Sequence, residues 1–521
     1  MRTKSRSSRK KIIILAISLI VIISVPFVFL TQITARYEAT IDFAFDTPPN
    51  DATFLEADEA LLESIVLELS ARYPEYHIPL NQSASAVFHN DSAEHGGEIS
   101  YMNVSHWRHS DNHALWTGID FTGWTYKYLV AIQEGNETMA EFAEYVLIRL
   151  TTGFSYMMKV PNGGLGPEYG GILARGYAPP DTENIWPQIF GDRFKHTNGT
   201  GEYSQWRYRG YTSNDEFAGY YLFLALATRY LMHIEYIQER VSLIVDQICY
   251  NMLQNIFHGV HTTGSTTGVS QLPTLLSGGF WAALSLKLGS IHHPEKYLSY
   301  YHHYVSNDLI YLANAESGRQ NILGGYYPYN FGTCVVLAFL LLEDPSTNIW
   351  QHYFQGYLDT LWSNTRYHRN AWFNVAFLMI CHENGLLEED LNEDFDFISR
   401  DIKDQLQRFV NHHDPLPIYR RATLPHPEDV ELFNPVERLE EELNLPKPVM
   451  DFLDIIGLRT ERQLAERPLT LEYHETHRWV WEKNPFQYRE RSEDRFRTES
   501  GAVLTVPYWM MRYLGYFGGD V

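Results

Sequence analysis

Apolar residues recur at three- and four-residue spacing through most of the chain, which is the pattern of helices that bury one face. The pattern lacks the alternation of strands and helices that a parallel sheet requires. The predicted helices span 59–73, 113–134, 139–158, 215–231, 235–257, 271–288, 294–314, 329–342, 348–363, 371–383, 391–411 and 501–514, with a weaker pair at 437–443 and 449–456. The polar stretch 74–112 predicts loop and short strands.

About twelve helices in sequential pairs predict an all-α fold, an (α/α)6 toroid or barrel of helical hairpins. No repeat of fixed length is visible, which argues against an open solenoid. Two long connections interrupt the helices. Residues 160–214 are rich in Gly, Pro, Trp and Tyr, whereas residues 412–470 are acidic and Pro-rich and are expected to form an insertion packed on one face.

A long uncharged run lies near the N-terminus. Basic residues in positions 1–11 precede this run, which extends from Ile12 to Leu30. At ~1.5 Å per residue it makes a helix of roughly 28 Å, close to the thickness of the bilayer hydrocarbon core. Because basic residues stay cytoplasmic, we expect a single transmembrane signal anchor with the bulk of the chain outside the cytoplasm. A cleaved signal peptide, which would leave a secreted protein, is the alternative.

The chain therefore divides into a cytoplasmic basic arm (1–11), the anchor (12–30), a juxtamembrane linker (31–58) and the barrel ectodomain (59–521). The formal net charge of −23 repels phosphate backbones, so we expect no nucleic-acid partner. Each of the three cysteines lies in an apolar helical stretch. We expect these cysteines to be buried and free of disulfides: Cys249, Cys334 and Cys381.

Sequence templates for metal ions and cofactors are missing from the chain. It contains no H-E-x-x-H, C-x-x-C, G-x-S-x-G, Walker A or dinucleotide fingerprint, so we expect no metal and no cofactor. Aromatic residues make up 14% of the chain. Because Tyr and Trp combine an apolar face with a polar edge, they suit sugars, whose C–H faces stack while their hydroxyls form hydrogen bonds.

Two predicted helices start with the same polar residues. Ser110, Asp111 and Asn112 precede the helix at 113–134, and Ser213 and Asn214 precede the helix at 215–231, which begins with Asp215. Such residues cap helix N-termini, and capping alone is one interpretation. In a helical toroid the inner helices all start at one mouth. The other interpretation therefore places both aspartates in one cleft, as a catalytic acid and base, with the pKa of one raised by burial.

Gly118 and Gly219 follow these two helix starts. A glycine inside a helix costs ~1 kcal/mol relative to alanine, so close packing or the approach of a ligand is expected to hold each one. Arg175 lies in the connection between the two helices, where an arginine can bind a sugar carboxylate or phosphate, or pair with an acidic neighbour. The candidate substrate-binding residues are Asn112, Trp116, Arg175, Trp206, Arg207, Tyr211 and Asn214.

These motifs read D-N-x-A-x-W-T-G from Asp111, G-x-x-A-R-G from Gly171, and W-R-x-x-x-x-x-S-N-D-x-x-x-G from Trp206. Their order, together with segments 479–486 and 507–513, resembles exported (α/α)6-barrel proteins related to glycoside hydrolases. The resemblance covers most of residues 105–515. It implies the barrel fold and a carbohydrate-related activity, and it brings no proven catalytic residue with it.

The sequence thus predicts a membrane-anchored, extracytoplasmic, carbohydrate-active protein. It is either a glycoside hydrolase that uses Asp111 and Asp215, or a polysaccharide lyase that uses a tyrosine or histidine base beside an arginine. A non-catalytic ectodomain that binds glycan or a partner protein is the alternative. The expected partners are the membrane, through residues 12–30, and a carbohydrate. Convergence of both aspartates on one pocket would separate the enzyme from the binding protein.

Overall fold

A computed structural model describes residues 48–88, 104–108, 112–182, 196–210, 212–255, 258–260, 266–270, 279–306, 327–414, 420–421, 432–433, 447, 464–465, 467–470, 485–486 and 497–518. These residues are mostly helical, and the predicted all-α class is confirmed. Within the described part of the chain, none of the helices combines the length and the apolar character needed to cross a membrane. The predicted anchor at 12–30 and the predicted helices at 437–443 and 449–456 lie outside the described residues.

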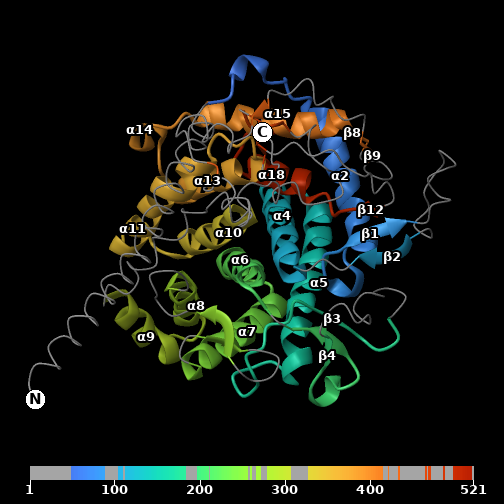
Figure 1. Ribbon diagram of the computed structural model, residues 1–521, viewed down its shortest axis with the longest axis vertical. Helices are drawn as coiled ribbons and strands as arrows, with labels where there is room; N and C mark the ends of the chain where they lie inside the picture. The colour runs from blue at the N-terminus through green and yellow to red at the C-terminus, as the bar shows by residue number, and fades with distance from the viewer. Residues whose placement is uncertain are drawn as a thin grey trace, which may run out of the picture.

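The long helices lie where the apolar periodicity predicts them (Figure 1). They are α2 (Glu59–Tyr76), α4 (His113–Gln133), α5 (Glu137–Asn162), α6 (Asn214–Tyr230), α7 (Glu235–Gln254), α8 (Gly279–His292), α9 (Pro294–Ser306), α10 (Tyr327–Leu342), α11 (Asn348–Gly356), α13 (Ala371–Glu383), α15 (Phe395–His412) and α18 (Ala502–Tyr513). The short helical segments are η1 (Asp51–Thr53), η2 (Pro79–Asn81), η4 (Gly201–Tyr203), η7 (Tyr357–Trp362), α12 (Ser363–Thr365) and α14 (Glu388–Leu391).

Helices α4 and α6 lie side by side and run in the same direction. The ring centroids of Phe121 and Phe223 are 4.8 Å apart, and those of Tyr126 and Tyr230, further along both helices, are 5.9 Å apart. On its other side α4 packs along α18, where the ring of Tyr126 lies 5.3 Å from that of Tyr513. Later residues of α4 contact later residues of α6, so the two helices are parallel.

Helix α8 is also parallel to α6. The hydroxyl of Tyr221 hydrogen-bonds with that of Ser285, and two turns later the Thr228 hydroxyl lies 2.8 Å from Nε2 of His292. Helix α10 packs along α6 as well, and the guanidinium of Arg229 donates to the last turn of α10. Helices α4 and α13 are buried on nearly every side, which is typical of helices enclosed by other helices.

The remaining long helices cover this group (Figure 1). Helix α5 packs on α4, α7 on α6 and α8, α9 on α8, α11 on α10, and α15 on α13 and α18, while α2 packs on α18 and α15. Helices α5 and α7 each bury one face and expose the other. The described helices thus form an enclosed group and a covering group.

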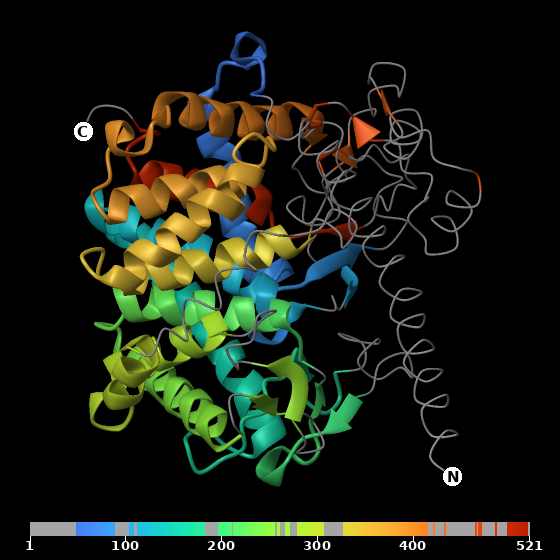
Figure 2. The ribbon, with the colours of Figure 1, turned by 60° about the vertical axis from the view of Figure 1, so that its left-hand side comes forward.

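Short antiparallel strands precede three of the enclosed helices. One sheet has the order β12 (Arg497–Thr498), β1 (Ser85–Phe88), β2 (Val104–Arg108), and a second has the order β3 (Gly176–Ala178), β5 (Arg207–Arg209), β4 (His196–Asn198). The two-stranded sheets are β6 (His258–Val260) with β7 (Thr266–Ser270), β8 (His413–Asp414) with β9 (Arg420–Arg421), and β10 (Leu432–Phe433) with β11 (Leu464–Ala465). Figure 2 shows the strands on one side of the helices, on the right in that view. Because β2, β5 and β12 directly precede α4, α6 and α18, those helices start on this side.

The three cysteines are buried and free, as the sequence predicts. The sulfhydryl of Cys249 donates to the carbonyl of Ser285 at 3.0 Å, and Cys334 and Cys381 lie within the main hydrophobic core. They act as small core residues.

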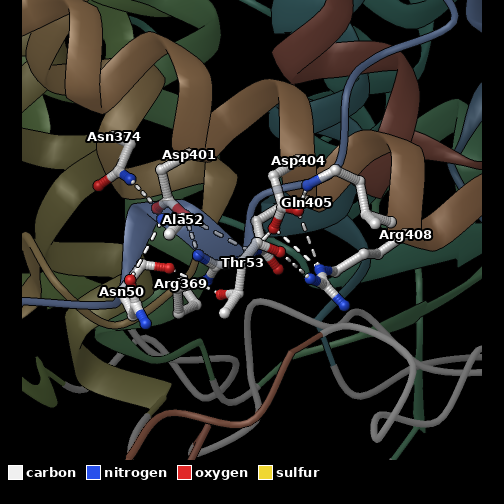
Figure 3. A network of polar contacts seen from close by, with 10 residues as sticks. Asn50, Ala52, Thr53, Arg369, Asn374, Asp401, Asp404, Gln405 and Arg408 are labelled. Atoms are coloured by element: carbon white, nitrogen blue, oxygen red, sulfur yellow. Dashed lines mark hydrogen bonds and ion pairs between the residues drawn. The ribbon is translucent and has the colours of Figure 1, made fainter.

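Residues 50–58, the end of the predicted linker, are docked on α15 (Figure 3). We call these residues the N-terminal strap. The backbone N–H of Leu55 donates to Asp404 at 2.6 Å, that of Asp58 donates to Gln407 at 2.8 Å, and the carbonyl of Thr53 accepts from an α15 arginine. Side chains that bind backbone groups leave no apolar periodicity, so the sequence pattern did not reveal this docking.

Arg369 joins the strap to α15 and to the start of α13 (Figure 3). Its guanidinium is buried, lies 2.9 Å from Asp401, forms an ion pair with Asp404 and stacks 4.6 Å from the ring centre of Phe54. Its φ of 53° is in the left-handed region, which a residue with a side chain rarely adopts. Burial raises the pKa of Asp401, and the nearby guanidinium opposes that shift.

Candidate functional site

The first turns of α4 and α6 touch through their backbones. A Cβ atom placed on Gly118 would lie 2.8 Å from Cα of Gly219, and one placed on Gly219 would lie 2.5 Å from the carbonyl carbon of Ala114. Real Cβ atoms are almost never found so close to other atoms. Of the two explanations that the sequence offers for these glycines, the structure supports close packing of the helices.

Arg175 links the starts of these two helices. Its Nη1 donates to Oδ1 of Asn112 at 2.9 Å, and its Nη2 donates to the hydroxyl of Ser213 at 2.7 Å. Asn112 and Ser213 are the residues that precede the first turns of α4 and α6. The backbone N–H of Arg175 donates to the carbonyl of Arg209 in β5, which fixes the arginine beside both helices. One guanidinium therefore holds two helix starts in register.

Glu216 is the acid at the centre of this arrangement. Its side chain is fully buried, and Oε2 accepts the backbone N–H of Ala114 at 2.9 Å, so an acid of α6 caps the start of α4. Its Oε1 lies 3.6 Å from Nη1 of Arg175. Burial raises the pKa of Glu216 well above its usual range, and the charge of Arg175 opposes this only in part. Burial therefore favours the protonated, uncharged form of Glu216.

Glu216 is not among the candidate residues predicted from the sequence. It follows Asp215 at a helix start, where acidic residues are common because they favour the helix dipole. The available signal was spacing, because Glu216 lies three residues before Gly219 and so shares its helix face. In this region burial raises the pKa of Glu216, a residue that was not among the predicted candidates.

Asp215 lies in the first turn of α6 and is partly exposed. It accepts a hydrogen bond from the hydroxyl of Ser213, which also binds Arg175. Asp111, the other candidate catalytic residue, lies outside the described residues but directly precedes Asn112 in the chain. The structure therefore brings Asn112, Arg175 and Asp215 together.

The two candidate tryptophans pack against other side chains of the protein. Trp116 is 2% exposed within the main hydrophobic core, because its position on α4 faces neighbouring helices, so it offers no open surface to a ligand. Trp206 stacks on Tyr156 of α5 and on Tyr177 of β3, with centroid distances of 5.1 and 5.8 Å. The Trp206 stack connects the small sheet to α5, so the structure gives it a packing role.

The remaining candidates are only partly described. Arg207 begins β5 and pairs with Ala178 and Asn198 of the neighbouring strands. Asn214 is the first residue of α6, and Tyr211 lies outside the described residues.

The arrangement has the chemistry of a site for anionic or hydroxyl-rich ligands. Two helix N-termini carry partial positive charge, Arg175 is partly exposed, and Asp215 is an accessible carboxyl group beside them. Over the described ranges, no group of three or more His, Cys, Asp or Glu side chains is placed to hold a metal ion. Comparison of the chain with protein-family models, with curated proteins and with solved structures finds no match.

Proposed function

We propose that this chain is a carbohydrate-active protein built on an (α/α)6 barrel. In this proposal α4, α6, α8, α10, α13 and α18 form the inner ring, and α2, α5, α7, α9, α11 and α15 form the outer ring. The parallel packing of α6 with both α4 and α8, the burial of α4 and α13 on nearly every side, and the covering helices support it.

The proposed site lies at the start of the inner helices. The observation that carries it is the convergence of Arg175 and Asp215 on the touching first turns of α4 and α6. Asp215, with Asp111 beside Asn112, is the proposed proton-transfer group of a glycoside hydrolase. Glu216 is too buried to touch a substrate, and its proposed role is to hold Arg175 and the start of α4 in place.

A non-catalytic glycan-binding protein is the second candidate, and one observation favours it. The guanidinium of Arg175 already donates to Asn112 and Ser213, and the hydroxyl of Ser213 is shared with Asp215. A site whose polar groups satisfy one another binds a ligand through their outer edges, without a carboxyl group free for chemistry. A lyase, with a tyrosine or histidine base beside arginine, remains the third candidate.

The proposed location is the outer face of a membrane, with residues 12–30 as the anchor. The uncharged run after six basic residues supports it. If that run is cleaved as a signal peptide, the protein is secreted, and the proposed site is unchanged.

A glycan array probed with the detergent-solubilised full-length protein tests the proposal. Replacement Arg175→Lys keeps the charge but removes the two-pronged donor, so glycan binding should weaken. Arg240→Lys, on the outer face of α7, is the matched control and should bind as the wild type does. If no glycan binds the wild type, or if Arg175→Lys binds as the wild type does, the proposed site is wrong.

A further inference from the structure

A small cavity lies between the first and last long helices of the described chain. Its polar lining comes from Ser70 and Tyr73 of α2, Asp120 of α4, and Ser500 and Thr505 at the start of α18. Its volume is about 10 Å³, which is room for one water molecule. Three elements that are distant in the sequence therefore meet at one polar point.

The carboxyl group of Asp120 is the acid in this cavity. Asp120 is 3% exposed, and its Oδ1 accepts the hydroxyl of Ser500 at 2.8 Å. Its Oδ2 is buried and has no hydrogen-bond partner within bonding distance among the described residues. The hydroxyls of Tyr73 and Ser83, which are 3.0 Å apart, lie nearby. A buried oxygen without a partner costs about 1–3 kcal/mol, and a water molecule in the cavity removes that cost.

Among the described residues, no cation lowers the pKa of Asp120. Burial raises the pKa of Asp120 to about 7, and the three hydroxyls of Tyr73, Ser83 and Ser500 lower it only in part. The same helix carries Lys127, two turns on, whose ammonium is buried against the rings of Trp124 and Trp509 at 4.6 and 5.4 Å. Burial lowers the pKa of Lys127 to about 7.

Other titratable groups belong to the elements packed around Asp120. They are Tyr73 and His77 of α2 and its C-cap, Lys127 of α4, Arg149 of α5, and Glu499 beside Ser500. Burial lowers the pKa of His77 to about 4 and raises that of Tyr73, so both stay uncharged near neutral pH. Asp120 and Lys127 are thus groups of this cluster whose charge changes near neutral pH, and a comparison with Asp120→Asn isolates the effect of the carboxyl group.

We propose that the protonation state of Asp120, beside its water-sized cavity, controls how tightly α2 and α18 pack on α4. The packing is tight when the carboxyl is protonated and looser when it ionises. The protonated carboxyl satisfies the hydroxyls around it without burying a charge. The ionised carboxyl must be hydrated, and the polar contacts between α2, α4 and the start of α18 are where water can enter. Protonation of Asp120 therefore tightens the junction between the first and last helices of the described fold.

The direction in which pH changes the folding stability follows from the pKa of Asp120 in the folded and unfolded states. The pKa of Asp120 in the folded protein is about 7, against 3.8 for the unfolded chain, so the folded state holds the proton more tightly. This stabilisation is complete below pH 3.8 and is lost as the pH rises towards 7. Between pH 5 and pH 8 the folding equilibrium constant of the wild type should fall roughly 100-fold relative to that of Asp120→Asn, which mimics the protonated acid at every pH.

Denaturant unfolding of the full-length protein between pH 5 and pH 8 tests the proposal. Asp359→Asn, at an exposed carboxyl group, is the control and should follow the wild type. If the unfolding free energies of the wild type and Asp120→Asn change with pH in the same way, the proposal is wrong. Ser500→Ala is the second variant, because loss of a donor to the carboxylate should move the wild-type profile to higher pH. An unchanged profile would also overturn the proposal.

A separate measurement locates the helix whose packing loosens when Asp120 ionises. Hydrogen exchange at pH 8 should be faster in α18 of the wild type than in α18 of Asp120→Asn. Equal exchange of α18 in the two proteins would show that ionised Asp120 does not act on this junction.

Discussion

Replacement of Gly219 by alanine sets two opposite effects against each other. Alanine is favoured over glycine inside a helix by ~1 kcal/mol, so propensity alone predicts a more stable protein. The new Cβ, however, would lie 2.5 Å from the carbonyl carbon of Ala114, whereas contacts under 3.4 Å are already uncommon. The neighbouring atoms are backbone atoms that cannot rotate away, so α4 and α6 must separate by roughly 1 Å.

The free-energy cost of separating the two helices can be estimated. Overpacking in a filled core typically costs 1–3 kcal/mol, and the same movement stretches the 2.9 Å hydrogen bond from Ala114 to Glu216. After the gain in helix propensity is subtracted, we expect Gly219→Ala to lose about 1–3 kcal/mol of unfolding free energy. The movement should also weaken any ligand binding at Arg175, because that residue bridges the two helices.

Urea unfolding followed by circular dichroism measures this loss. Gly123→Ala, on the same helix as Gly118, is the matched control, because its Cβ would lie 2.9 Å from a side-chain methyl of Val506 and 3.5 Å from the nearest backbone atom, so its close contact is not with backbone. The control should change stability much less. If Gly219→Ala is as stable as the wild type or more stable, the helices are not in backbone contact and our account of the site is wrong.

At pH 4.5 and below, Glu216→Gln should stay within ~1 kcal/mol of the wild type, because glutamine still accepts from Ala114, whereas Glu216→Ala should lose about 2–4 kcal/mol in urea unfolding. Because burial raises the pKa of Glu216, the wild type should lose stability relative to Glu216→Gln as the pH rises above 4.5, and equal profiles would contradict this. Arg369→Ala should cost about 3–5 kcal/mol, since it leaves the buried Asp401 without its cation, and an unchanged melting temperature would refute that ion pair. Because Cys334 and the other cysteines are free, a reducing agent should leave the melting temperature of the wild type unchanged.

Helix positions followed from the sequence because apolar spacing reports directly on buried faces. The predicted helix 371–383 matches α13 at both ends, and the Asn and Ser residues expected to precede α4 and α6 do so. Apolar spacing did not predict the segments whose contacts with the rest of the protein are polar. The strap at 50–58 is held by side chains that bind its backbone, and such contacts carry no periodic signal.

For a related reason, the candidate site could be predicted only in part from the sequence. Arg175 and Asp215 were predicted from residue type and context, and the structure brings them together. Trp116 was chosen as a ligand-binding aromatic, yet the direction in which a helix residue points depends on its neighbours, and here it points into the core. Glu216 could not be separated from an ordinary helix-start acid without knowing that α6 touches α4.

Sugar release from a panel of polysaccharides by the full-length protein shows whether Asp215 transfers a proton in catalysis. The wild type and Asp359→Asn should release sugar, whereas Asp215→Asn should release none and should unfold at the same temperature as the wild type. If Asp215→Asn turns over substrate as fast as the wild type, Asp215 is not the proton-transfer group. If the wild type binds a glycan and releases nothing, the non-catalytic alternative replaces the enzyme.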